Sequence, residues 1–486
     1  MTPIEDHRFF WRQHPALLFA LTLYIGTAAA LFWQNLSNWI FPLFWCSYLV
    51  WLKKWPVLLV LVASAAYCHF LTDRAPQTGM AKGIFSISTL QPHQSPFAKG
   101  SVYKGTFYAI EGSVPCDIYT HGPKPPQTAN RDYFVSGKLD RRGPCQYAFK
   151  PKEWIPIEGS WSFAEWRYAT KERYRHFLSE ICSDYPRAAR FLAALTTGDV
   201  DDRLLKYEFG RLGLQHLLAI SGFHFGILIA FASLVLSLFL PRSWKLLFLL
   251  VSLTAYYFFV GPFPAVQRSW LTAMAYLMGK LINRQTSGLN LLGFALGFEI
   301  VSNPFICSHL GFQFSFASCA GILLFHSPFE RKLRLMLPKR SSDETTFLPF
   351  FAKHGYLLSS FLRNSIALNL AVNTAILPIL LFHFHAFPLL SLLYNLFFPF
   401  CVGIALCGLL VALTLHLLIP SIASFFFSAT ACFTAQLLDI AAYPPSALDY
   451  TIVVSQLPSW SIPFWLFALL VFCLKNSSVI SSVKAA

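Results

Sequence analysis

Long apolar runs alternate with short polar breaks along most of the chain, and this pattern predicts repeated crossings of a lipid bilayer. Three runs come first, at residues 15–33, 38–52 and 56–72. After a polar region, further candidate spans lie at 216–240, 244–262, 265–281, 288–302, 310–326, 358–382, 388–418, 422–441 and 459–474. A spanning helix needs roughly 20 mostly apolar residues, a length that several of these runs approach or exceed. The pattern predicts a polytopic α-helical membrane protein with about twelve spans.

The run at 388–418 is too long for one straight span, and it contains Pro399 with Gly403 nearby. Proline lacks a backbone donor and clashes with the preceding helical turn. We expect a broken or re-entrant helix here, which needs protein or water around its freed backbone groups.

Residues 73–168 differ from the rest, because they are polar, rich in proline and glycine, and alternate apolar with polar side chains. The alternation predicts strands at 101–110, 132–139 and 146–149. A region of this size made of short strands suits a small barrel, such as an oligonucleotide- or oligosaccharide-binding (OB-like) fold. We therefore predict an OB-like β domain over residues 73–168.

An amphipathic pattern follows at 169–212, where apolar side chains recur at helical spacing. The apolar face includes Tyr174, Phe177, Leu178, Ile181, Leu192 and Leu195. Trp161 and Trp166 are suited to anchor a segment at a membrane–water interface. We expect interfacial helices here, with Gly198 ending one of them.

Composition and charge indicate how the chain is oriented. Hydrophobic residues make up 55% and charged residues 13% of the sequence, which excludes an ordinary soluble domain. Lys and Arg retained on the cytoplasmic side explain much of the net charge of +15, and the remaining excess would attract a polyanion. Arg8, Arg12, Lys53-Lys54 and the basic loop 327–355 all agree with cytoplasmic N- and C-termini and an extracytoplasmic β domain.

The crossings counted from the basic N-terminus divide the chain into segments. These are N-terminal transmembrane helices at 1–72, the extracytoplasmic β domain at 73–168, interfacial helices at 169–212, a second membrane domain at 213–475 and a cytoplasmic tail at 476–486.

The 11 cysteines are scattered, and most lie in or beside apolar runs, where a thiol behaves as a small hydrophobe. The spacing contains no CxxC pair and no Cys/His cluster, so the sequence predicts no metal site and no cofactor. Cys116 and Cys145 lie in the polar region and could form a disulfide in an oxidising compartment.

Polar side chains inside the apolar runs are the candidate functional residues. Such groups are costly in lipid, so they indicate a protein interior or a water-filled path, and glycines beside them allow close approach to the backbone. The residues that could line such a path are His216, Ser221, Gly222, His224, Gly226, Arg268, Gln313 and Ser315.

Each of these residues also has a simpler interpretation. Arg268 could extend to the membrane surface, and Ser315 could bond its own helix backbone. Ser221 with His224 could be a nucleophile and its base, but residues three apart in one helix rarely hold that geometry. No Asp or Glu in the segment would orient the histidine, so we expect a protein that is not an enzyme.

The β domain combines basic with aromatic residues, which suits single-stranded nucleic acid through phosphate attraction and base stacking. The predicted basic contacts are Lys104, Arg131, Lys138, Arg141 and Arg142. The interleaved aromatic residues are Tyr103, Phe107, Tyr108, Tyr133, Phe134 and Tyr147. Alternatively the aromatic rings form the barrel core and the charges a solvated face, because a strand buries one side.

Several blocks of the second membrane domain occur in a characteristic order. They are HLLAISGFHFGIL at 216–228, the span start Arg268-Ser269-Trp270-Leu271, SGLNLLGFALGFEIVSNPF at 287–305, GFQFSFASCAGILLF at 311–325 and LPILLFHFHAFPLLSLLYNLFFPF at 377–400. Together these blocks resemble the ComEC-type competence family, the inner-membrane channels through which bacteria import transforming DNA. A few spans followed by an outer barrel fit the same family.

The resemblance implies a multi-pass channel in the bacterial inner membrane that takes single-stranded DNA into the cytoplasm. Its implied partners are the lipid bilayer, a periplasmic DNA receptor and a cytosolic motor or strand-binding proteins. Many family members also carry a C-terminal metallo-β-lactamase-like domain. This chain stops soon after its last span and has no histidine-rich metal motif, so we expect the form that lacks that domain.

Two other functions remain open from the residues alone. The same histidines could be proton relays in a small-solute or proton-coupled secondary transporter, although few acidic residues lie in the spans. The barrel could instead bind an envelope polymer such as peptidoglycan.

Overall fold

The computed structural model describes residues 3–31, 39–94, 99–110, 112–121, 131–143, 146–200, 202–340, 349–445 and 449–458, with a few more between 461 and 472. The expected span at 459–474 and the expected tail at 476–486 lie largely or wholly outside these residues, as does Cys145. The predicted disulfide between Cys116 and Cys145 therefore stays a prediction.

The N-terminal segment forms α1 (Pro3–Gln13), α2 (Pro15–Leu31), α3 (Ile40–Trp51) and α4 (Trp55–Asp73). The last three coincide with the first three apolar runs of the sequence. The helical parts before and after His14 meet at a bend of 98°. α2 then packs against α4 and α12 (Gly288–Ser302).

The bend between α1 and α2 is held by polar side chains of α12. Asn290 donates to the Gln13 carbonyl over 2.8 Å and accepts from the Ala16 backbone N–H over 3.3 Å. These are backbone groups that the break in the helix would otherwise leave unpaired. Gly293, one turn further along α12, lets the two helices touch, since a Cβ there would lie 2.4 Å from the backbone N of Leu17.

A closed barrel follows, made of β1 (Gly79–Gln94), β2 (Lys99–Tyr108), β3 (Ser113–His121), β4 (Tyr133–Gly143) and β5 (Gln146–Pro156). The strands lie in the order β1-β2-β3-β5-β4, antiparallel except for the parallel pair β3–β5. The strands expected at 101–110, 132–139 and 146–149 are present as β2, β4 and β5. The strands β1 and β3 were not expected from the sequence, because their alternation is interrupted by a register shift at Ser88 and by Pro115.

The barrel core includes most of the aromatic side chains that the sequence left ambiguous, together with aliphatic side chains of β1, β3 and β4. Tyr103, Phe107, Tyr133 and Tyr147 are buried, so for these residues the core interpretation is correct. Tyr108 and Phe134 are exposed on the outside. Basic side chains and most of the aromatic rings therefore occupy different sides of the strands, as the alternation of a strand requires.

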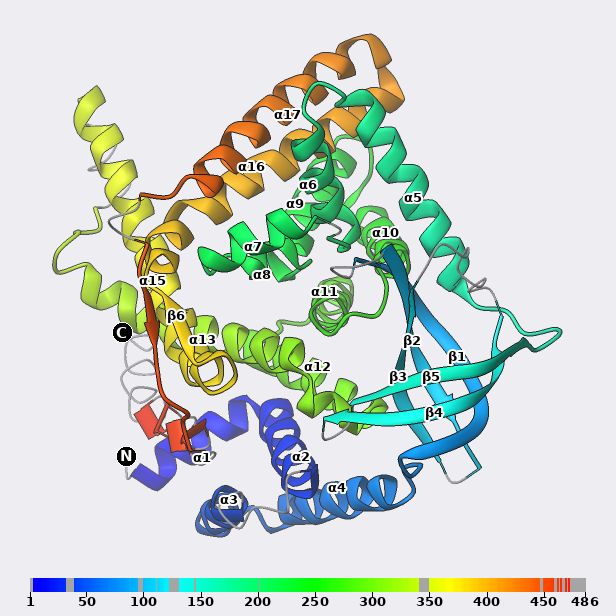
Figure 1. The fold of residues 1–486 in the computed structure, drawn as a ribbon. Coiled ribbons are helices and arrows are strands. Elements are labelled where there is room, and N and C mark those ends of the chain that lie inside the picture. Colours follow the sequence, from blue (N-terminus) through cyan, green and yellow to red (C-terminus); the bar gives the residue numbers. More distant parts are fainter. Residues whose placement is uncertain are drawn as a thin grey trace.

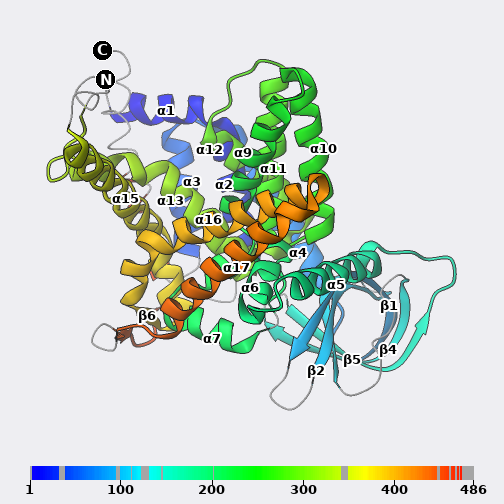
Figure 2. The same cartoon turned by 90° about the horizontal axis from the view of Figure 1, so that it is seen from above.

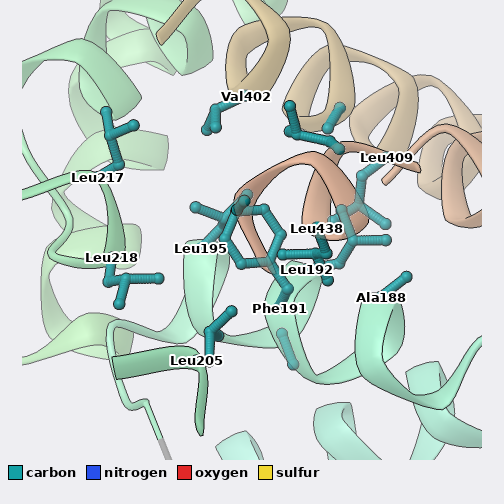
Figure 3. Close-up of a cluster of buried hydrophobic side chains, with 14 of the residues drawn as sticks. Ala188, Phe191, Leu192, Leu195, Leu205, Leu217, Leu218, Val402, Leu409 and Leu438 are labelled. Carbon is teal, nitrogen blue, oxygen red and sulfur yellow. The ribbon is translucent and has the colours of Figure 1, made fainter. Parts of the chain in front are cut away.

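The barrel is followed by α5 (Phe163–Ile181), α6 (Pro186–Thr197), α7 (Arg203–Arg211) and α8 (Gln215–Leu218). Every residue of α6 from Ala188 to Thr197 is buried, apart from Arg190. Figure 3 shows Phe191, Leu192 and Leu195 of α6 surrounded by Val402, Leu409 and Leu438 of two long helices. α6 is therefore a core helix, so its apolar face packs on protein and not on a membrane surface.

The remaining helices are α9 (Gly222–Ser237), α10 (Arg242–Val260), α11 (Pro264–Leu281), α12, the 3-10 helix η2 (Pro304–Ser308), α13 (Leu310–Leu333), α15 (Phe350–Phe384), α16 (Leu390–Leu418) and α17 (Pro420–Ala442). A short ribbon pairs β6 (Ala386–Pro388) with β7 (Thr451–Val453). Among the described residues, six helices are long and apolar enough to cross a membrane, or up to seven if the bent pair α1–α2 counts as one span. The molecule is thus a membrane protein with an attached barrel domain.

Two expectations about these helices are wrong. α16 is one continuous helix of 29 residues, and Pro399 lies inside it without a break. Conversely, the run expected as one span at 216–240 is interrupted between α8 and α9, where Ala219 and Ser221 have extended backbones. The break between α8 and α9 could not be seen from apolar composition, and Pro399 does not break α16.

Most of the helices form one layer, and the remaining elements lie on its two faces (Figure 1 and Figure 2). Figure 1 shows the barrel beside α5, α10 and α12, with α16 and α17 at the opposite edge of the layer from α3 and α4. In Figure 2, α1 lies along one face of the layer, and the barrel, α7 and β6 lie on the other.

The close contact at Gly293 generates the first prediction. We expect Gly293→Ala to lower the unfolding free energy by about 1–3 kcal/mol, because the added methyl group overlaps the α2 backbone. Gly297→Ala, one turn away, is the matched control, since a Cβ there would meet only Ala20 Cβ at 3.7 Å. Thermal unfolding in detergent measures both, and equal unfolding temperatures for the two variants would contradict the packing.

Candidate functional site between the barrel and the helices

A buried carboxylate joins the barrel to the helices. Asp199 follows Gly198, whose left-handed backbone (φ 76°) ends α6, and it is 7% exposed. Its Oδ2 atom lies 2.9 Å from Lys171 Nζ and 3.2 Å from Arg175 Nη2 on α5. Its Oδ1 atom accepts a hydrogen bond of 2.9 Å from Gln91 Nε2 on β1. One side chain therefore connects α5, α6 and the barrel.

The cations of α5 also bind the end of α10. Lys171 Nζ donates to the Val260 carbonyl over 2.8 Å, and Arg167 Nε donates to the Phe258 carbonyl over 2.7 Å. Arg167 Nη1 donates over 2.7 Å to the carbonyl of Ser88, where the register of β1 shifts. Burial lowers the pKa of both cations, and the charge of Asp199 opposes that shift. The connection from α10 to α11 is thereby fixed against the barrel.

A second connection, between α12 and α13, also lies at the barrel. His309 is the N-cap of α13, where its Nδ1 accepts from the Gly311 backbone N–H over 3.1 Å. Burial lowers the pKa of His309, and the charge of Lys104 on β2 adds to this effect. Lys104, one of the predicted nucleic-acid contacts, thus lies near the start of a membrane helix.

The HLLAISG segment leads into the N-terminus of α9. Ser221 is the N-cap of α9, with Oγ accepting from the Phe223 backbone N–H over 3.3 Å. The Ser221 backbone N–H in turn donates to His224 Nδ1 over 3.2 Å, which completes a reciprocal capping box. Ser221 and His224 therefore allow a helix to begin inside an apolar stretch, because their side chains cap its first turn.

The capping box decides how Ser221 and His224 can act. Ser221 Oγ also lies 3.2 Å from His224 Nδ1, closer than expected for two residues of one helix, because Ser221 lies outside the helix. Since Nδ1 accepts the backbone N–H, its lone pair is occupied and the ring proton belongs on Nε2. His224 is 2% exposed, and its Nε2 has no hydrogen-bond partner among the described residues. This arrangement is a cap with a buried donor, and it does not leave Nδ1 available as a base.

Arg268 on α11 lies against the start of α9. A Cβ at Gly222 would lie 3.1 Å from Arg268 Nη2, so the glycine makes room for the guanidinium. Arg268 donates to Ser269 Oγ over 3.2 Å and contacts Cys319 Sγ on α13. It is 5% exposed, and Nε has no partner within the described part of the chain. The alternative that Arg268 extends to the membrane surface is therefore wrong.

Glu299 on α12 is a functional candidate that was not among the site residues predicted from the sequence. It is 1% exposed, and neither carboxylate oxygen has a hydrogen-bond partner among the residues described. The positive charge of the Arg268 guanidinium interacts electrostatically with the Glu299 carboxylate. An acidic residue in an otherwise apolar helix is the signal that could have identified it.

The other predicted path residues are more dispersed. Gln313 Nε2 donates to the Cys307 carbonyl over 2.9 Å and so supports η2, while Ser315 is buried on the same helix. A Cβ at Gly226 would meet no described atom within 4 Å, and His216 is exposed on α8. The structure thus brings together Ser221, Gly222, His224 and Arg268, with Glu299 and Cys319 added.

The predicted basic residues of the barrel form two groups. Lys104 pairs across the strands with Asp117, and Arg142 also acts on that carboxylate. Lys138 lies 3.1 Å from Asp140 on β4, which holds the pKa of Asp140 below its usual range. The other two, Arg131 and Arg141, are exposed. Lys104 and Arg142 therefore belong to the β2–β3 surface, and Lys138 belongs to the β4–β5 surface.

The buried polar residues around Arg268 lie close to the helix ends on the barrel side. Arg268 is in the second turn of α11, which begins at Pro264, and Glu299 is in the last turn of α12, which ends at Ser302. The connection before α11 lies against β1, since a Cβ at Gly261 would be 3.3 Å from Thr89 Cγ2, and the connection after α12 lies near Lys104 of β2. We call this group the inner polar cluster; it consists of Ser221, His224, Arg268, Glu299 and Cys319.

Comparison with known proteins places this site in context. The family model described as "Competence protein" matches residues 197–478, which is more than half of the chain. "ComE operon protein 3" of Bacillus subtilis (strain 168) is 30% identical over 251 residues, which is 50% of this chain and 28% of that protein. The chain therefore spans less than a third of that relative's length. No solved structure matches the chain.

The ion pairs of Asp199 generate the second prediction. We expect Asp199→Asn to lower the unfolding free energy by about 3–5 kcal/mol, because Lys171 then keeps a buried charge without its counter-charge. Adding Lys171→Met should restore part of that loss, since the uncompensated charge is gone. Thermal unfolding in detergent measures the cycle. Asp140→Asn at the more exposed Lys138 pair is the control, and its loss should be much smaller because solvent screens that pair. Strictly additive losses at Asp199 and Lys171 would contradict a coupled ion pair.

Proposed function

Because this chain belongs to the competence protein family, we propose that it conducts single-stranded DNA through the bacterial inner membrane during natural transformation. The inner polar cluster is the observation that carries this proposal. It leaves a donor on His224, a donor on Arg268 and both oxygens of Glu299 without hydrogen-bond partners in the described structure. Unpaired polar groups cost free energy inside a membrane protein, so their retention indicates a task with a polar or charged ligand.

The route we propose begins at the barrel and ends between the helices. Lys104 and Arg142 supply positive charge on the β2–β3 surface, and His309 lies next to Lys104 at the start of α13. The connections at α10–α11 and α12–α13 then lead to Arg268, whose guanidinium can bind a phosphate with two parallel hydrogen bonds. Gly222 keeps the backbone of α9 close to that guanidinium. Other predicted path residues, namely His216, Gly226, Gln313 and Ser315, would shape the same route.

We infer that the barrel is of the OB type. Its five strands close in the order β1-β2-β3-β5-β4. OB folds bind oligonucleotides on the surface of strands 2 and 3 and on the loops between strands 1 and 2 and strands 4 and 5. Lys104 on β2 and Arg142 beside the β4–β5 turn lie where this mode of binding requires positive charge.

The orientation of the protein is part of the same proposal. The barrel would lie outside the cytoplasm, with both chain termini inside. The proposed total of about twelve spans adds α11 and the run at 459–474 to the seven long candidates and the shorter apolar helices α3, α9 and α12. The basic segment around Arg331 and Lys332 at the end of α13 would then be cytoplasmic. The proposed divisions remain 1–72, 73–168, 169–212, 213–475 and 476–486.

The proposed partners follow from transport of a single strand. DNA would reach the barrel from a periplasmic receptor, and a cytosolic motor or strand-binding proteins would draw it inward. The role requires no cofactor and no catalytic residue. It is a channel function, and Ser221 and His224 serve in it as a helix cap and a buried donor.

Glu299 favours one second candidate, a proton-coupled secondary transporter, because a buried carboxylate in a membrane helix can carry a proton. Glu299→Gln separates the two functions. The DNA channel keeps Arg268 and loses a negative charge near the path, so import of labelled DNA should be maintained. A proton-coupled transporter loses its proton carrier, so pH-driven uptake of small solutes into proteoliposomes should stop.

Arg268 gives the direct test of the DNA role. We expect Arg268→Ala to reduce import of labelled DNA in the native host by about tenfold or more, the range of one or two lost charge-assisted hydrogen bonds. Arg268→Lys should retain part of the import, since it keeps the charge without the planar fork. The control is Arg284→Ala, an exposed arginine beyond the other end of α11. Unchanged import in Arg268→Ala, at equal protein level in the membrane, would reject the proposed role of this residue.

A further inference from the structure

Arg142 and Tyr119 form a stacked pair on the outside of the barrel. The guanidinium carbon of Arg142 lies 4.6 Å from the centroid of the Tyr119 ring. Arg142 is exposed near the end of β4, and Tyr119 is half-buried on β3. The pair therefore joins two strands that are separated by β5 in the barrel order.

Strand alternation places Tyr119 on the outer surface. Its neighbour Ile118 is fully buried in the barrel core, so Tyr119 points the other way. Across the strands, Tyr119 is paired with Val102 and Asp117 with Lys104 on β2. Tyr119, Asp117 and Lys104 thus share the β2–β3 surface with Arg142 above them.

Asp117 holds this arrangement in place. A side-chain hydrogen bond joins Asp117 and Tyr119, and another joins Tyr119 and Arg142. Burial raises the pKa of Asp117, while the charges of Lys104 and Arg142 oppose the shift. A half-buried carboxylate between two cations fixes the phenol and the guanidinium with little freedom. The ring and the guanidinium plane are therefore presented in a preorganised form.

We propose that the Tyr119–Arg142 pair is a stacking platform for one nucleobase of a single strand, with Lys104 binding an adjacent phosphate. This inference rests on the proposed function, because it takes single-stranded DNA as the ligand. Bases stack on aromatic rings and on guanidinium planes, whatever their sequence. A platform of this kind binds every base and so suits a protein that must accept any strand.

The surface differs from an ordinary patch of positive charge. Arg141, the next residue, is equally exposed and carries the same charge, but it is paired across the strands with Tyr147, whereas the guanidinium over Tyr119 is that of Arg142. Tyr108 is an exposed tyrosine of the same barrel (48%), yet it lies at the end of β2 without a stacked cation among the described contacts. Arg141 and Tyr108 are matched controls for charge and for exposed aromatic surface.

The experiment measures oligonucleotide binding by the full-length protein in lipid nanodiscs at one fixed salt concentration. The probes are a fluorescent oligothymidine and an abasic strand of equal length, which keeps the phosphates and lacks the bases. We expect Tyr119→Leu to weaken oligothymidine binding about tenfold, the size of one stacked base. The abasic strand should bind both proteins equally. Tyr119→Phe keeps the ring but loses the phenol's hydrogen bonds to Asp117 and Arg142, so it should retain most of the binding that Tyr119→Leu loses.

A second variant keeps the test independent of folding at Tyr119. Arg142→Lys retains the positive charge at an exposed position and removes the planar group. It should weaken oligothymidine binding several-fold and leave abasic binding unchanged, whereas Arg141→Lys and Tyr108→Leu should change neither.

The outcomes separate this inference from the proposed function. If wild-type protein binds neither strand, the proposed DNA role of the barrel fails and the platform fails with it. If wild-type protein binds DNA and Tyr119→Leu matches Tyr108→Leu, the platform is overturned and the DNA role stands. Equal losses on oligothymidine and abasic strands would also overturn the platform.

Discussion

The buried carboxylate of Asp199 is the contact on which the arrangement of this molecule depends. Its two oxygens have partners on α5 and on β1, and Lys171 carries the connection on to the Val260 carbonyl at the end of α10. A buried ion pair is stable only when its hydrogen bonds are satisfied, and here they are made by three separate elements. The barrel is consequently fixed beside the α10–α11 and α12–α13 connections, which puts Lys104 near His309. Together with the hydrogen bonds of Arg167 to Ser88 and Phe258, this contact sets the position of the basic barrel surface relative to the inner polar cluster.

Much of the fold could be predicted from the chain, because hydrophobic length and strand alternation are local properties. Within the described residues, most of the apolar runs form helices at nearly the expected positions, and three of the barrel strands were predicted. The errors came from tertiary contacts. α6 is amphipathic in sequence, but its apolar face packs on α16 and α17 and not on a membrane surface, so it is a core helix. Ser221 starts a helix inside an apolar run, because a hydroxyl and an imidazole can cap α9 without leaving the protein interior.

The site was foreseen in part. The polar residues Ser221, His224 and Arg268, predicted from apolar runs, lie close together in the structure, while their role in a path remains a prediction. Glu299 and Cys319 were missed as members of the cluster, since only the packing of α11 against α12 and α13 brings them to Arg268. On the barrel the charges alone did not distinguish Arg141 from Arg142. That difference comes from the closure of the barrel, which carries Arg142 over Tyr119.

The central claim is that a DNA strand passes the inner polar cluster, and the chain's own cysteines allow a direct measurement. Cys319 contacts Arg268, while Cys407 is exposed on another helix, α16. A single strand carrying a thiol-reactive bromoacetyl group can be stalled during import by a bulky trailing end, and the labelled cysteine identified by mass spectrometry. The account predicts an adduct on Cys319 that disappears in Cys319→Ser. Import with labelling at Cys407 or on the barrel, and none at Cys319, would contradict it.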